Sequence, residues 1–63
     1  MRVLLVEPDK AMMDKEANQL QAVGFMVDHA TSGHDAIAML KLYDYDIAVL
    51  ELGLPDIEGH DVV

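Results

Sequence analysis

The sequence predicts an α/β fold that forms half of a doubly wound parallel sheet. Two short apolar runs, at residues 3–6 and 47–50, lack the alternation of polar and apolar residues that marks a half-exposed strand. Such runs are typical of strands that are buried on both faces of a parallel sheet. Segments with helical spacing of apolar residues separate the strands, which indicates right-handed parallel crossovers. The expected order is therefore strand, helix, strand, helix, strand and the start of a third helix.

The first strand and helix have clear boundary signals. The strand is expected over residues 2–7, and Pro8 ends it because proline has no N–H to donate to a neighbouring strand. Asp9 stands where a helix N-cap belongs, and the helix begins at Lys10. Its apolar stripe consists of Met13, Ala17 and Leu20. Gly24 occupies the position just past the helix, where glycine commonly ends it.

The second strand is expected over residues 25–30, with polar and apolar residues alternating, which indicates a strand nearer the sheet edge. Its Asp28 is expected to be solvated. Ser32, followed three residues later by Asp35, resembles a capping box and begins a helix that ends near Leu42.

The third strand is expected over residues 46–50, buried on both faces and leading into Glu51. A loop marked by glycine and proline follows, at Gly53, Pro55 and Gly59. A third helix is expected to start near Asp56 or Glu58.

Composition excludes several classes of function. The chain has 63 residues, with 4 Lys and Arg against 12 Asp and Glu, and its net charge of −8 argues against direct binding to nucleic acid or an anionic membrane. It has no cysteine for disulfides or thiolate metal sites. It has neither an apolar run of the roughly 20 residues that a membrane span needs nor a secretory signal. We expect a soluble, cytoplasmic domain. It is not expected to be an enzyme, because it shows no nucleophile–base pair and no glycine-rich phosphate loop.

Three carboxylates follow the strand ends. Ligands of open α/β sheets bind beyond the carboxyl ends of the strands, and Glu7, Asp9 and Glu51 converge there if the first and third strands are neighbours. Clustered carboxylates repel one another unless they are protonated or bridged by a cation, which predicts a divalent ion such as Mg²⁺ or Ca²⁺. The alternative is that Asp9 only caps its helix while Glu7 and Glu51 are solvated strand ends.

Three stretches also carry a resemblance to a known family: residues 1–7 (MRVLLVE), 43–46 (YDYD) and 52–59 (LGLPDIEG). With them the whole chain resembles a bacterial response-regulator receiver domain. The resemblance implies a flavodoxin-like fold, which has five strands and five helices in the intact family. Residues 1–63 would then be a single truncated receiver domain, its N-terminal half. It also implies phosphoryl transfer from a sensor-kinase histidine to an aspartate that ends the third strand, assisted by Mg²⁺.

Carried over residue by residue, the resemblance places Glu51 at the phosphoacceptor position and Pro8 at the position of a direct metal ligand. The Gly53 carbonyl is the backbone ligand, and Glu7 matches the outer acidic residue, which usually acts through water. Pro8 offers no side-chain ligand, although Asp9 can lean in to replace it in part. The Glu51 carboxylate lies one bond, roughly 1.5 Å, farther out than an aspartate's, and in-line transfer tolerates such displacement poorly. We therefore expect a degenerate receiver that needs no cofactor and acts by protein contact without ordinary phosphorylation.

Other interpretations stay open. The chain can instead be a phosphoacceptor or Mg²⁺-binding fragment that regulates a DNA-binding output domain outside it. The longer acid at Glu51 either mimics a phosphate or reflects loss of function. A histidine kinase or another signalling protein is the expected partner. In the intact family a fourth strand pairs with the third. Without it, residues 47–50 are expected to pair antiparallel in a two-fold homodimer or to be covered in a domain-swapped arrangement, unless the chain is a piece of a longer receiver.

Overall fold

A computed structural model describes residues 1–51 of the chain. Three strands form one parallel sheet in the order β2-β1-β3, with β1 at Arg2–Val6, β2 at Met26–Ala30 and β3 at Ile47–Leu50. The predicted strands are confirmed, although each is one residue shorter at one end than expected. The expected loop and the start of a third helix lie outside the described residues.

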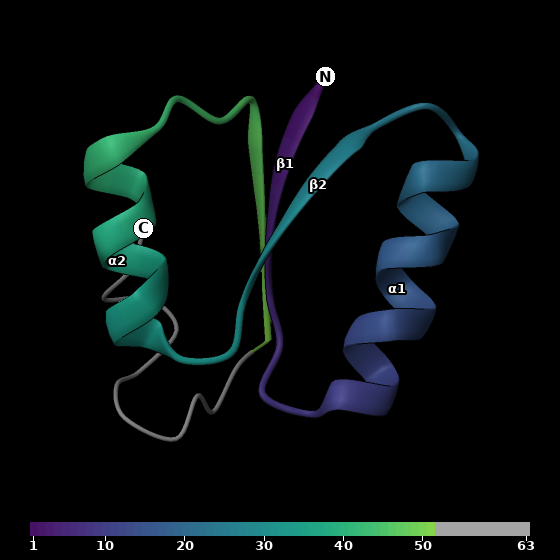
Figure 1. The fold of residues 1–63 in the computed structure, drawn as a ribbon, viewed down its shortest axis with the longest axis horizontal. Helices are drawn as coiled ribbons and strands as arrows, with labels where there is room; N and C mark the ends of the chain where they lie inside the picture. The colour runs from purple at the N-terminus through teal and green to yellow at the C-terminus, as the bar shows by residue number, and fades with distance from the viewer. Residues whose placement is uncertain (52–63) are drawn as a thin grey trace.

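The two helices cover opposite faces of this sheet (Figure 1). α1 spans Lys10–Ala22 and α2 spans Gly33–Leu42. Both predicted caps form: an Asp9 side-chain oxygen accepts a hydrogen bond from the Met12 amide at 3.0 Å, and the Ser32 hydroxyl accepts one from the Asp35 amide at 3.2 Å. Neither described helix has the length and apolar character needed to span a membrane.

The central strand β1 carries the core of the molecule. Its apolar residues are fully buried, and alternate side chains face opposite helices, as the two-residue period of a strand requires. On the α2 face, Leu4 and Val6 pack with Ala36, whereas on the α1 face Leu5 packs with Met13. This two-sided burial explains why β1 has no polar residue between its ends.

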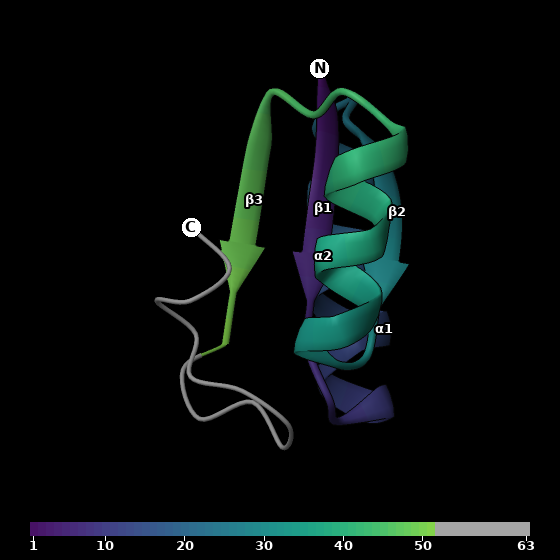
Figure 2. The same cartoon turned by 90° about the vertical axis from the view of Figure 1, so that its left-hand side faces the viewer.

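The expectation that β3 is buried on both faces is wrong for the described part of the chain. Ile47 is 42% exposed, Ala48 is exposed, and Val49 and Leu50 are half-buried. The reason is geometric: α1 and α2 lie over β1 and β2, and β3 stands to one side of them (Figure 2). Within residues 1–51, β3 therefore has one neighbouring strand and little cover from the helices.

Candidate functional site

The carboxyl edge of the sheet brings two of the predicted site residues next to the ends of neighbouring strands. Glu7 follows β1, and its amide donates a hydrogen bond to the Ala30 carbonyl at 3.0 Å. Glu51 follows β3, and its amide donates to the Val6 carbonyl at 3.1 Å. Because β1 lies between β2 and β3, these two bonds fix both carboxylates at the same edge, as the strand order predicts.

Glu7 is an unusual residue for this edge because its carboxylate is buried. Glu7 is 4% exposed, and among residues 1–51 its Oε2 atom has no hydrogen-bond partner. Burial is the main cause that raises the pKa of Glu7, followed by the negative charges of Glu51, Glu16 and Asp9. The site thus favours a protonated Glu7 or a compensating positive charge. Sequence spacing did not indicate Glu16, whose only signal was its position on the first helix.

The described residues do not make up a complete divalent-cation site. Within residues 1–51, no three acidic or histidine side chains lie close enough together to hold a metal ion. Pro8 has no side-chain oxygen, and Asp9 uses one of its oxygens to cap α1. The predicted carbonyl ligand, Gly53, lies outside the described residues, so the predicted ligand set as a whole stays a prediction.

Two features of the alternative interpretation of the three carboxylates are present in the structure, and neither excludes a role as a ligand. Asp9 caps its helix, and Glu51 is exposed at the strand end. Glu7 does not fit this interpretation, because it is buried rather than solvated.

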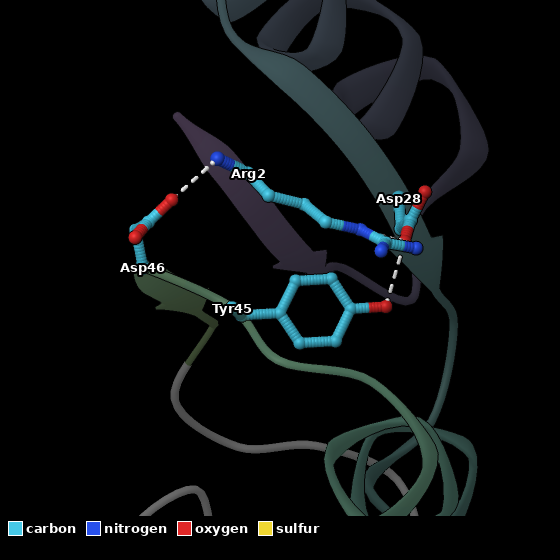
Figure 3. Close-up of polar contacts among 4 residues, drawn as sticks. All are labelled: Arg2, Asp28, Tyr45 and Asp46. Atoms are coloured by element: carbon cyan, nitrogen blue, oxygen red, sulfur yellow. Dashed lines mark hydrogen bonds and ion pairs between the residues drawn. The ribbon is translucent and has the colours of Figure 1, made fainter.

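A second polar cluster lies at the opposite, amino edge of the sheet, and sequence reasoning missed it (Figure 3). The Arg2 guanidinium donates to Asp28 Oδ2 at 2.9 Å, and the Tyr45 hydroxyl donates to the same oxygen at 2.7 Å. The rings of Tyr43 and Tyr45 lie 5.0 and 5.3 Å from the guanidinium carbon. Asp46 accepts a hydrogen bond from the Arg2 amide at 2.8 Å. The cluster therefore ties β1 to β2 and to the segment that enters β3.

The expectation that Asp28 is a solvated charge is wrong. Its hydrogen bond from Tyr45 and then its pairing with Arg2 lower the pKa of Asp28 below its ordinary value. Burial and the same bond raise the pKa of Tyr45. The available signal was the parallel register, which sets Asp28 beside Leu4 on the face covered by α2. A carboxylate on that face needs partners, and Tyr45 and Arg2 provide them.

Comparison with known proteins shows the family to which the chain belongs. The family described as the response regulator receiver domain matches residues 3–63. The chain belongs to this family.

Relatives and solved structures agree with this assignment. The cell cycle response regulators CtrA of Brucella ovis and Brucella anthropi are each 43% identical over 63 residues, which cover 100% of this chain and 27% of each relative. A CheY-like receiver from Methanospirillum hungatei has a TM-score of 0.93 and 28% identity, covering 97% of this chain and 49% of that one. The response regulator TrrA of Thermotoga maritima, in complex with Mg(2+)-BeF, has a TM-score of 0.93 and 28% identity to this chain. The match covers 97% of this chain and 53% of the TrrA chain.

These similarities confirm the predicted fold and family. The chain is a response-regulator receiver of two-component signalling with the N-terminal part of a flavodoxin-like sheet. It spans about half the length of the solved receivers and about a quarter of the length of the CtrA relatives.

Proposed function

We propose that this receiver works by protein contact and is not phosphorylated in the ordinary manner. The observation that carries the proposal is Glu51 at the end of β3, where the receiver family has its phosphoacceptor aspartate. Pro8 removes a direct metal ligand at the end of the neighbouring strand β1. Two changes at one site act in the same direction, because in-line transfer needs both the acceptor oxygen and the cation in place.

Glu7 lies at the same edge of the sheet as Glu51. Within the described residues its buried Oε2 has no hydrogen-bond partner, and the pKa of Glu7 is raised by burial and by the surrounding carboxylates. Tight binding of Mg²⁺ needs oxygen ligands from neighbouring residues to balance the charge of the ion, and the Pro8 side chain supplies none. We therefore propose that the acidic edge does not serve as a phosphoryl-transfer centre.

The partner class follows from two-component signalling. TrrA is also known in complex with the histidine kinase ThkA, and that TrrA structure has a TM-score of 0.90 and 28% identity to this chain. We propose a histidine kinase or a related cytoplasmic signalling protein as the partner, and a homodimer as the form in which the chain acts. The net charge of −8 disfavours direct contact with nucleic acid.

The test is incorporation of phosphate from acetyl phosphate with Mg²⁺, read by intact-mass spectrometry. The wild-type chain is expected to gain no phosphate. The double variant Pro8→Asp with Glu51→Asp restores both family positions and is the matched gain-of-function control. Mg²⁺-dependent phosphate on the wild-type chain would contradict the proposal.

A second candidate function has one observation in its favour, the 43% identity to the cell cycle response regulators CtrA. In this alternative, the chain is a phosphoacceptor or Mg²⁺-binding receiver segment that uses Glu7, Asp9 and Glu51. It would regulate an output domain outside this chain. The same phosphate assay separates the two candidates, since only the second predicts a labelled wild-type chain.

A further inference from the structure

The start of β3 is held to the neighbouring strand by Asp46, which uses both its backbone and its side chain. The Asp46 amide donates a hydrogen bond to the Arg2 carbonyl at 2.9 Å. One oxygen of the Asp46 carboxylate accepts a hydrogen bond from the Arg2 amide at 2.8 Å (Figure 3). The two bonds close a ring around the backbone of Arg2, so they join one particular residue of β1 to one particular residue before β3.

The residue before Asp46 ties the same segment to the far strand of the sheet. The Tyr45 hydroxyl donates to Asp28 on β2 at 2.7 Å, and β1 lies between β2 and β3. Residues 45 and 46 therefore hold the start of β3 against both other strands. We call this set of contacts, made by Arg2, Asp28, Tyr45 and Asp46, the amino-edge clasp.

The sequence of β3 does not by itself select one register on β1. Register in a sheet is normally set by the pattern of apolar residues, because a slip of one residue moves every side chain to the opposite face. β3 reads IAVL, so each of its four positions is apolar on whichever face it lies. The observed register nevertheless pairs Val3 with Ile47 and Val6 with Leu50. Contacts outside these four residues of β3 must therefore select it.

The hydrogen bonds at the two ends of β3 are unequally spaced on the two strands. The carbonyls of Arg2 and Val6 are four residues apart on β1, whereas the amides of Asp46 and Glu51 that donate to them are five residues apart. In a regular parallel ladder the two intervals would be equal. The segment that starts at Asp46 thus contains one more residue than the part of β1 that it spans, as in a β-bulge. Without this extra residue, the amide at the Val6 carbonyl would be that of Leu50.

We infer that Asp46 is a positioning residue, which holds Arg2 at the amino edge, fixes the register of β3 and so places Glu51 at the end of β1. Residues 46 and 51 are about 16 Å apart along an extended strand. A contact at one edge of the sheet thereby sets the geometry of the acidic edge at the other. A slip of one residue would turn the Glu51 side chain to the opposite face. The inference rests on the proposed function only in taking Glu51 as a site residue, and it holds whether or not that site accepts phosphate.

Amide hydrogen exchange of the full chain, followed residue by residue by NMR, tests this positioning. In Asp46→Ala the Arg2 amide loses its carboxylate partner, and exchange of the Glu51 amide is expected to become about tenfold faster. The Glu7 amide donates to the Ala30 carbonyl of β2, so it serves as the internal reference and is expected to keep its rate. A loss of global stability alone would accelerate both amides by the same factor.

Two further variants separate the hydrogen-bond acceptor from its charge. Asp46→Asn keeps a side-chain oxygen that can accept from the Arg2 amide, and it is expected to keep the slow exchange of Glu51. Asp44→Ala removes the same charge from an exposed neighbouring position and is expected to leave both amides unchanged. If Asp46→Ala unfolds, the comparison is made in sucrose, which favours the folded state without supplying an acceptor for the Arg2 amide.

Three results would overturn the inference. They are an unchanged Glu51 amide in Asp46→Ala, equal acceleration of Glu7 and Glu51 in that variant, and an Asp46→Asn variant that exchanges like Asp46→Ala. Phosphate labelling does not depend on these exchange rates, so this inference and the proposed function can fail separately.

Discussion

Removing the Tyr45 hydroxyl tests whether the cluster at the amino edge stabilises the fold. In Tyr45→Phe the ring remains near Arg2, but the 2.7 Å hydrogen bond to Asp28 is lost. A hydrogen bond to a charged group contributes about 1.5–3 kcal/mol when it is shielded from water. The Asp28 side chain is 34% exposed, and water replaces part of the lost bond. We therefore expect a loss of about 1 kcal/mol in the free energy of unfolding.

Thermal unfolding followed by circular dichroism measures this loss. A change of about 1 kcal/mol lowers the Tm of a domain of this size by about 4–8 °C. Tyr43→Phe is the matched control, because Tyr43 contacts Arg2 through its ring, which the substitution keeps. The Tm of this variant should differ little from that of wild type. All samples are compared at one protein concentration, since self-association would shift Tm. Equal shifts for Tyr45→Phe and Tyr43→Phe would refute the assigned role of the Asp28 bond.

The pH dependence of the Tm difference between wild type and Tyr45→Phe tests the same hydrogen bond in a second way. The pKa of Asp28 is lowered in the folded chain, so its contribution to stability is present above the ordinary value of 3.8. That contribution is lost as the pH falls through the lower, folded value. The Tm difference between wild type and Tyr45→Phe should therefore narrow in acid. A difference that widens as the pH falls below 3.8 would contradict the pairing.

Three further predictions follow from burial and backbone geometry. Leu4→Ala removes a fully buried side chain and should reduce the free energy of unfolding by about 3–5 kcal/mol, about the whole stability of a chain of this size. The circular dichroism spectrum of this variant should be that of an unfolded chain, whereas Leu42→Ala, on the surface, should keep the spectrum of wild type. Gly24→Ala places a side chain on a residue with a φ of +95° and should reduce the free energy of unfolding by about 1–2 kcal/mol. The loss is measured as a lower midpoint of urea unfolding. Glu7→Gln should raise Tm at neutral pH, because the raised pKa of Glu7 makes its ionised form destabilising. That gain should vanish below pH 4.5 and would be contradicted by a constant offset at every pH.

Local signals in the sequence predicted most of the fold. The apolar run of β1, the caps at Asp9 and Ser32 and the glycine at position 24 each fix one boundary through a short-range interaction. The parallel orientation of the strands followed from the helical segments that separate them, whereas the order β2-β1-β3 entered the sequence analysis only as a condition. These features needed no knowledge of what lies across the sheet.

What the sequence did not reveal depends on contacts between distant residues. The exposure of β3 follows from where the helices sit over β1 and β2, which residue periodicity does not encode. Burial of Glu7 and the joining of Asp28 to Tyr45 and Arg2 each need the register of neighbouring strands. The convergence of Glu7 and Glu51 was predictable because the carboxyl ends of adjacent parallel strands share an edge.

Binding of a phosphoryl analogue tests the central claim, that the receiver fold is present while its acceptor site is not functional. Beryllofluoride and Mg²⁺ are titrated into isotope-labelled chain while the amide resonances of Glu7 and Glu51 are followed by NMR. Both amides are fixed in the backbone hydrogen bonds of the sheet, so they report on the acidic edge directly. We expect the dispersed resonances of a folded sheet and no saturable shift at either amide. A saturable shift of both that requires Mg²⁺ and beryllofluoride together would contradict this claim.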